Sequence, residues 1–65
     1  MTIQEAKALL IFRESMEGGI AKDIHAESWA TVLEGVGYME ALEAAVAHYQ
    51  ESTEPLKPAH ILKRV

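Results

Sequence analysis

Glycine and proline divide this sequence into four stretches, and each stretch repeats its apolar residues at the spacing of an α-helix. The breaks lie at Gly18-Gly19, at Gly35-Val36-Gly37 and between Pro55 and Pro58. Glycine is frequent just after a helix and proline suits the first helical turn, so these positions separate helices. No stretch shows the apolar-polar alternation of a half-buried strand. The sequence therefore predicts an all-α fold, a small bundle of three main helices plus a short C-terminal helix.

The four predicted helices belong to a single domain, residues 1–65. They cover about residues 3–17, 22–34, 38–51 and 58–65. Thr2 and Glu5 have the spacing of a capping box at the start of the first helix. Pro58 suits the first turn of the fourth, because the N–H that proline lacks would have no partner there.

The apolar faces of these helices define the expected core. Its predicted members are Leu10, Trp29, Leu33, Tyr38, Leu42, Val46, Tyr49 and Ile61. We expect Trp29 at the junction of the second, third and fourth helices. Leu62 and Val65 are expected to point inward with Ile61. Ala44 and Ala47 fall on the far side of the third helix, where alanine serves mainly as a helix former.

Length and composition limit the class of protein. The chain has 65 residues and no cysteine, so it has a thin stability margin and no disulfide or thiolate metal site. The N-terminus lacks the basic segment and cleavage site of a signal peptide. No apolar run approaches the roughly 18 residues that a membrane span needs. We expect a soluble, cytoplasmic protein that does not contact a membrane.

Positive charge gathers at the end of an otherwise acidic chain whose net charge is −4. Residues 1–54 contain three lysines or arginines against ten acidic residues, whereas residues 55–65 contain three basic residues and no acid. The outer face predicted for the fourth helix carries four residues: Lys57, His60, Lys63 and Arg64. This basic face and Ile11, an apolar residue on the polar side of the first helix, are the candidate partner-binding residues. The alternative is that the basic residues only complement the helix dipole and aid solubility.

No residue pattern predicts an enzyme, a cofactor or a metal site. His25, His48 and His60 lie on three different predicted helices and lack the short spacings of zinc ligands. We expect His25 to pack at the core edge and His48 to be solvated. Arg13, inside an apolar arc, is expected to extend its head to solvent or to pair with Glu17. The glycine-containing segments lack the lysine and hydroxyl of a phosphate-binding loop.

A helix-turn-helix arrangement of the second and third helices would suggest DNA binding, but the charges oppose it. The third helix carries Glu40, Glu43 and Glu51 and has no lysine or arginine. Phosphates would repel such a helix rather than admit it to a groove. We interpret these carboxylates as a solvated face, and DNA as an unlikely partner.

The segment SWATVLEGVGYMEALEAAVAHYQES, followed by LKPAHILKRV, resembles a group of short phage and bacterial proteins. Their pattern is a tryptophan before a helix-ending turn, an alanine-rich helix ending in His-Tyr, a connector, and Pro-Ala-Asp-Ile. The quoted segment is similar to the N-terminal helical domain of the phage replicative-helicase loader/inhibitor family. The matching positions are Trp29, Leu33, Tyr38, Ala41, Leu42, Ala45, Val46, His48, Tyr49, Pro58 and Ile61. His60 stands where that pattern has an acidic residue.

In that family a helical domain is followed by a flexible C-terminal segment that contacts the hexameric helicase and holds it inactive until an initiator triggers loading. The resemblance implies a non-enzymatic accessory protein of phage DNA replication, acting in the host bacterial cytoplasm. Its partner would be the replicative helicase, its loader or an initiator. Two alternatives stay open: a small phage-encoded inhibitor of another host protein, and a weak DNA-binding module that uses the basic face.

Overall fold

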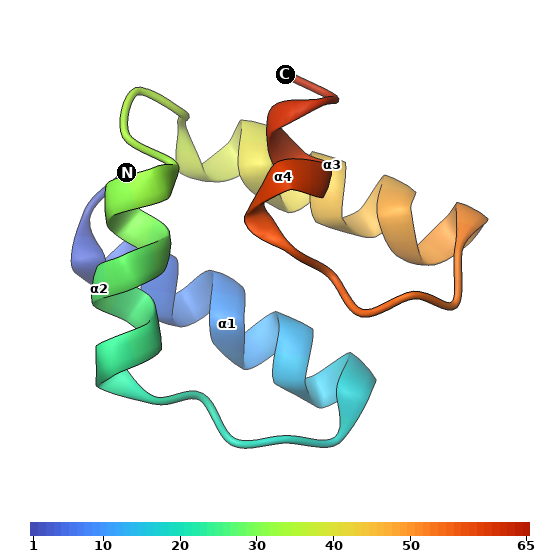
Figure 1. Ribbon diagram of the computed structural model, residues 1–65, viewed down its shortest axis with the longest axis horizontal. Coiled ribbons are helices and arrows are strands. Elements are labelled where there is room, and N and C mark those ends of the chain that lie inside the picture. Colours follow the sequence, from blue (N-terminus) through green and yellow to red (C-terminus); the bar gives the residue numbers. More distant parts are fainter.

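The computed structural model describes residues 1–65 and confirms the all-α class (Figure 1). The helices are α1 (Ile3–Glu17), α2 (Asp23–Val32), α3 (Tyr38–Glu51) and α4 (Pro58–Leu62). Helix α1 contacts both α2 and α3, and α4 packs on α3. The pair α1 and α3 is thus the centre of the bundle, with α2 added to one member and α4 to the other. None of the helices combines the length and the apolar composition needed to cross a bilayer.

Local signals account for the ends of α1 and the start of α3. The Glu5 amide donates to the Thr2 hydroxyl at 3.1 Å, and the Glu5 carboxylate accepts from the Thr2 amide at 2.8 Å, which completes the predicted capping box. Gly18 and Gly35 have φ angles of 87° and 84°, in the left-handed region that glycine enters without steric cost.

The helices α2 and α4 end two and three residues earlier than predicted, at Val32 and Leu62.

The core consists of two neighbouring clusters of buried side chains. The larger one contains Leu9, Leu33, Val36, Ala41, Ala44, Ala45, Leu56 and Ile61, and the smaller one contains Ala6, Leu10 and Ala26. Of the predicted core residues, Leu10, Leu33 and Ile61 are buried, and Trp29, Tyr38, Leu42 and Tyr49 are half-buried against the clusters.

Trp29 contacts both clusters, so it joins them. The guanidinium of Arg13 lies 5.5 Å from the centroid of its indole ring, within the range of a cation–π contact. Because α2 packs chiefly on α1, Trp29 joins α2 to α1, and the predicted junction of α2, α3 and α4 at this residue is wrong.

The buried side of α3 is rotated relative to the prediction. Val46, expected in the core, is 39% exposed, whereas Ala44, expected on the far side, is 5% exposed. The reason is the position of α4, which packs on α3 and extends the buried surface to Ala44 and His48. A single stripe of large apolar residues cannot reveal that a helix packs against neighbours on two sides.

Two further packing predictions are wrong. Leu62 and Val65 are 42% and 52% exposed, because α4 is a five-residue helix that presents only Ile61 to the core as a buried residue. His25, expected to be packed, is exposed, since α2 is anchored by Ala26 one position later.

The core assignment predicts opposite outcomes for two adjacent residues. Replacing Leu33 by alanine should lower the free energy of unfolding by about 2–5 kcal/mol, because the side chain is fully buried. Replacing its exposed neighbour Val32 by alanine should change it by less than about 0.5 kcal/mol. Thermal and urea melts followed by circular dichroism measure both. Equal effects of the two substitutions would contradict the assignment of Leu33 to the core.

Candidate functional site

Polar side chains of α1 converge on the connector between α3 and α4. Leu56 in this connector is fully buried. Its backbone N–H donates to the Glu17 carboxylate at 2.8 Å, and its carbonyl accepts from Arg13 Nε at 2.9 Å. A buried peptide group without partners costs about 1–3 kcal/mol per unsatisfied atom. These two hydrogen bonds therefore allow an irregular segment to enter the core.

The two α1 side chains are themselves held in place. Arg13 and Glu17 are one helical turn apart and form an ion pair, with 3.3 Å between Arg13 Nη2 and Glu17 Oε1. This is one of the two arrangements predicted for Arg13. The hydroxyl of Tyr49 on α3 donates to the same carboxylate, and Arg13 also pairs with Glu14. We call Arg13, Glu17, Tyr49 and Leu56 the connector clamp.

The clamp fixes the protonation states of its acidic members. Desolvation alone would raise the pKa of Glu17, but the hydrogen bonds from Tyr49 and the Leu56 amide, together with the Arg13 charge, hold that pKa below its ordinary value. Burial, followed by the hydrogen bond to the charged Glu17, raises the pKa of the Tyr49 phenol above its ordinary range. At neutral pH Glu17 is therefore an anion and Tyr49 a neutral donor, as the clamp requires.

A pair of stacked histidines holds the other side of the connector. His48, predicted to be solvated, is 4% exposed, and its Nε2 lies 2.7 Å from the carbonyl oxygen of Glu54. Because the partner is a carbonyl, Nε2 must carry the hydrogen. The imidazole of His60 stacks on His48 with 4.4 Å between ring centroids and 25° between planes. His60 Nδ1 accepts the Lys57 amide at 2.9 Å, at the start of α4.

These histidines do not form part of a metal-binding group. One nitrogen of each ring is already engaged by the connector backbone. No set of three or more histidine, aspartate or glutamate side chains is arranged to hold a metal ion.

The predicted basic face is divided in the structure. Arg64 turns back to pair with Glu51 of α3, and the Nε2 of half-buried His60 lies 3.8 Å from the Glu54 carboxylate. Lys57 and Lys63 are exposed and form no ion pair.

The other predicted partner-binding residue, Ile11, is 56% exposed on α1. Its side chain therefore meets solvent, as the sequence pattern predicts.

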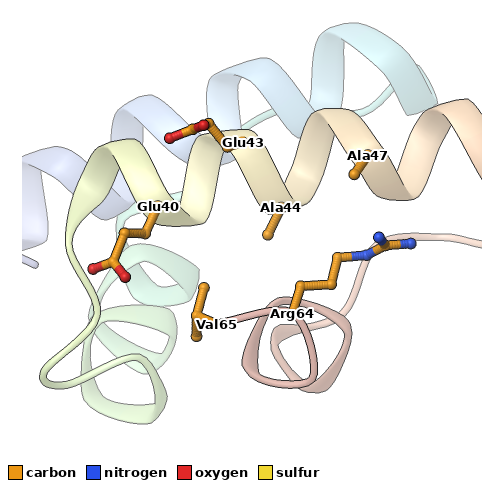
Figure 2. Close-up of a pocket in the computed structure, with 6 residues that line it drawn as sticks. All are labelled: Glu40, Glu43, Ala44, Ala47, Arg64 and Val65. Atoms are coloured by element: carbon orange, nitrogen blue, oxygen red, sulfur yellow. The ribbon is translucent and has the colours of Figure 1, made fainter.

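An open groove with a volume of about 330 Å³ lies between α3 and the C-terminal end (Figure 2). Its lining residues are Glu40, Glu43, Ala44, Ala47, Arg64 and Val65. Ala44 and Ala47 point across the groove toward the Arg64 side chain, and Glu40 lies beside Val65. Sequence reasoning did not identify this groove, because it joins residues about twenty positions apart in the chain.

Leu56 and His48 are two residues around the connector that the sequence pattern did not assign to the core. Leu56 is the one apolar side chain other than proline between Ser52 and Lys57, which is a signal that could have been used. Burial of His48 had no comparable signal, because it depends on where the connector runs.

The clamp predicts a specific pH dependence. Because the pKa of Glu17 is lower in the folded chain, Glu17 stabilises the fold above its ordinary pKa of about 4.3, and this contribution is lost as the pH falls through the lower folded value. A Glu17→Gln variant should be less stable than the parent at pH 7, and the difference should shrink below about pH 4. Urea melts at several pH values measure this. A Glu27→Gln variant, altered on the exposed side of α2, is the control and should match the parent throughout. If the stability difference between Glu17→Gln and the parent stayed constant down to low pH, the claim that Glu17 acts in the clamp as an anion would be contradicted.

Comparison of the chain with protein-family models, with curated proteins and with solved structures gives no significant match. The resemblance to the helicase loader/inhibitor family thus stays a prediction that rests on the residues quoted for it.

Proposed function

We propose that this chain is a non-enzymatic accessory protein of phage DNA replication, which binds a replication protein and modulates the loading or activity of the replicative helicase. The proposed partner is the helicase, its loader or an initiator. The resemblance of residues 29–61 to the helicase loader/inhibitor family supports a role in DNA replication. The groove beside α3 is the observation that supports binding of a protein.

The chemistry-bearing side chains support a binding role rather than a catalytic one. Glu17 and Arg13 are hydrogen-bonded to Leu56 of the connector, and Tyr49 donates to Glu17. His48 is buried against the connector. Each of these groups stabilises the fold through a contact that a substrate would have to displace. A general acid or base needs the opposite, a free group within hydrogen-bond reach of a reacting atom.

The shape of the groove also favours a protein partner. Pockets for small molecules are enclosed and bury most of the ligand. This groove is open along α3; its apolar floor is formed by Ala44 and Ala47, and Val65 lies on the opposite wall. Such a surface accepts a side chain that projects from another protein and leaves the rest of the partner outside.

The two alternatives have weaker support. DNA binding would rest on Lys57 and Lys63, and two exposed cations on a chain with net charge −4 give little counterion release. Inhibition of another host protein would use the same groove and differs only in the partner.

The proposal is tested by titrating the purified chain separately with the replicative helicase, its loader, the initiator and duplex DNA, using isothermal calorimetry. We expect binding to one of the three proteins and none to DNA at moderate salt. In a helicase-loading assay the bound chain should change the rate of loading or unwinding. If the folded chain bound none of the three proteins, the role in replication would be refuted. A host protein captured by the chain in that case would support the inhibitor alternative.

The two free lysines give a separate prediction about the basic face. Replacing Lys57 and Lys63 together by glutamate should leave the free energy of unfolding within about 1 kcal/mol, because both side chains are exposed and unpaired. The affinity for the replication partner should fall and become less sensitive to salt, if these charges meet acidic groups on it. Calorimetry at two salt concentrations measures this. Unchanged affinity would remove the basic face from the binding surface.

A further inference from the structure

We infer that the groove between α3 and the C-terminal end binds a basic amphipathic segment of the partner protein. One apolar side chain of that segment enters the groove above Ala44 and Ala47, and its lysine or arginine residues meet Glu40 and Glu43. This inference rests on the proposed protein-binding function and adds the chemistry of the segment that is bound.

The floor of the groove provides the apolar part of this recognition. Ala44 and Ala47 are small, so they leave the space that a larger side chain would fill (Figure 2). Val65, which is 52% exposed, and the side chain of Arg64 form the opposite wall. An apolar side chain placed here would remove both itself and these walls from water.

The charges around the groove select a cationic segment. Neither Glu40 nor Glu43 forms an ion pair, and the one internal hydrogen bond of their carboxylates joins Glu40 to the Gly37 amide at 3.2 Å. The cation of the groove, Arg64, is already neutralised by Glu51. The groove therefore has uncompensated negative charge, which attracts lysine and arginine and repels phosphates and acidic segments.

The exposed surface of α3 continues this pattern beyond the groove. Met39, Glu43 and Val46 follow one another at helical spacing of four and three residues, so they share one side of the helix. Met39 and Val46 are both exposed apolar residues. A partner helix whose apolar residues recur every three or four positions could place one residue in the groove and others on this stripe, with Glu43 between them.

The test uses two model helical peptides, one built from leucine and lysine and a matched one built from leucine and glutamate. Each is titrated into the isotope-labelled full chain while amide chemical shifts are recorded. We expect the leucine-lysine peptide to shift the amides of residues 39–47 and 64–65, and the leucine-glutamate peptide to shift none of them. Shifts spread evenly over all four helices would overturn the inference.

Matched charge reversals separate a specific groove from general attraction to an acidic protein. Glu43→Lys should weaken peptide binding about tenfold, whereas Glu27→Lys, with the same change in net charge on exposed α2, should have little effect. Glu43→Gln should give an intermediate loss. Circular dichroism melts check that each variant is folded. If Glu43→Lys and Glu27→Lys weakened peptide binding equally, the peptide would be attracted by the net negative charge of the protein and not by the groove. That result would overturn the inference.

The same variants distinguish failure of the groove from failure of the proposed function. A replication partner that binds the parent chain and Glu43→Lys equally well would refute the groove and leave the function standing. Peptide binding that depends on Glu43, without binding of any replication protein, would refute the function and leave the groove standing. Concentration-dependent shifts of the same amides in the chain alone would show that a second copy occupies the groove, which would also overturn the inference.

Discussion

The hydrogen bonds between Leu56 and two side chains of α1 position the C-terminal part of the molecule. A buried residue outside regular structure needs partners for both its N–H and its carbonyl, and Glu17 and Arg13 supply them. With Leu56 fixed, Pro58 begins α4 two residues later and Ile61 reaches the core. Arg64 and Val65 then lie opposite α3, where they form one wall of the groove. The candidate binding surface thus depends on a polar contact on α1.

Features of the fold that depend on residues close together in the sequence could be predicted from the sequence. The bounds of α1 and α3 follow from the Thr2–Glu5 capping box, the glycine at position 18 and the turn before Tyr38. Burial of Leu10 and Leu33 follows from apolar residues repeating at helical spacing. In each case the controlling interaction spans a few residues, so the local pattern contains the information.

The position of α4 could not be predicted in this way, and most errors follow from it. Because α4 packs on α3, Ala44 and His48 are buried on a side of α3 that the sequence pattern left outside the core. The connector is mostly polar in sequence. Burial of Leu56 is explained only by its hydrogen bonds to Glu17 and Arg13, which are distant in the sequence. The candidate site has the same origin, since Glu40 and Val65 become neighbours only through the packing of α4.

Hydrogen exchange at the Leu56 amide, measured by NMR on the intact chain, is the most direct test of whether α1 holds the connector in the core. If the amide is held by Glu17 inside the core, it should exchange at a rate close to that of global unfolding, far more slowly than the exposed Thr53 amide in the same connector. In a Glu17→Gln variant the Leu56 amide should exchange faster, with little change at the centre of α1. Exchange of Leu56 as fast as that of Thr53 in the parent chain would contradict the account, because the connector would then be open to solvent.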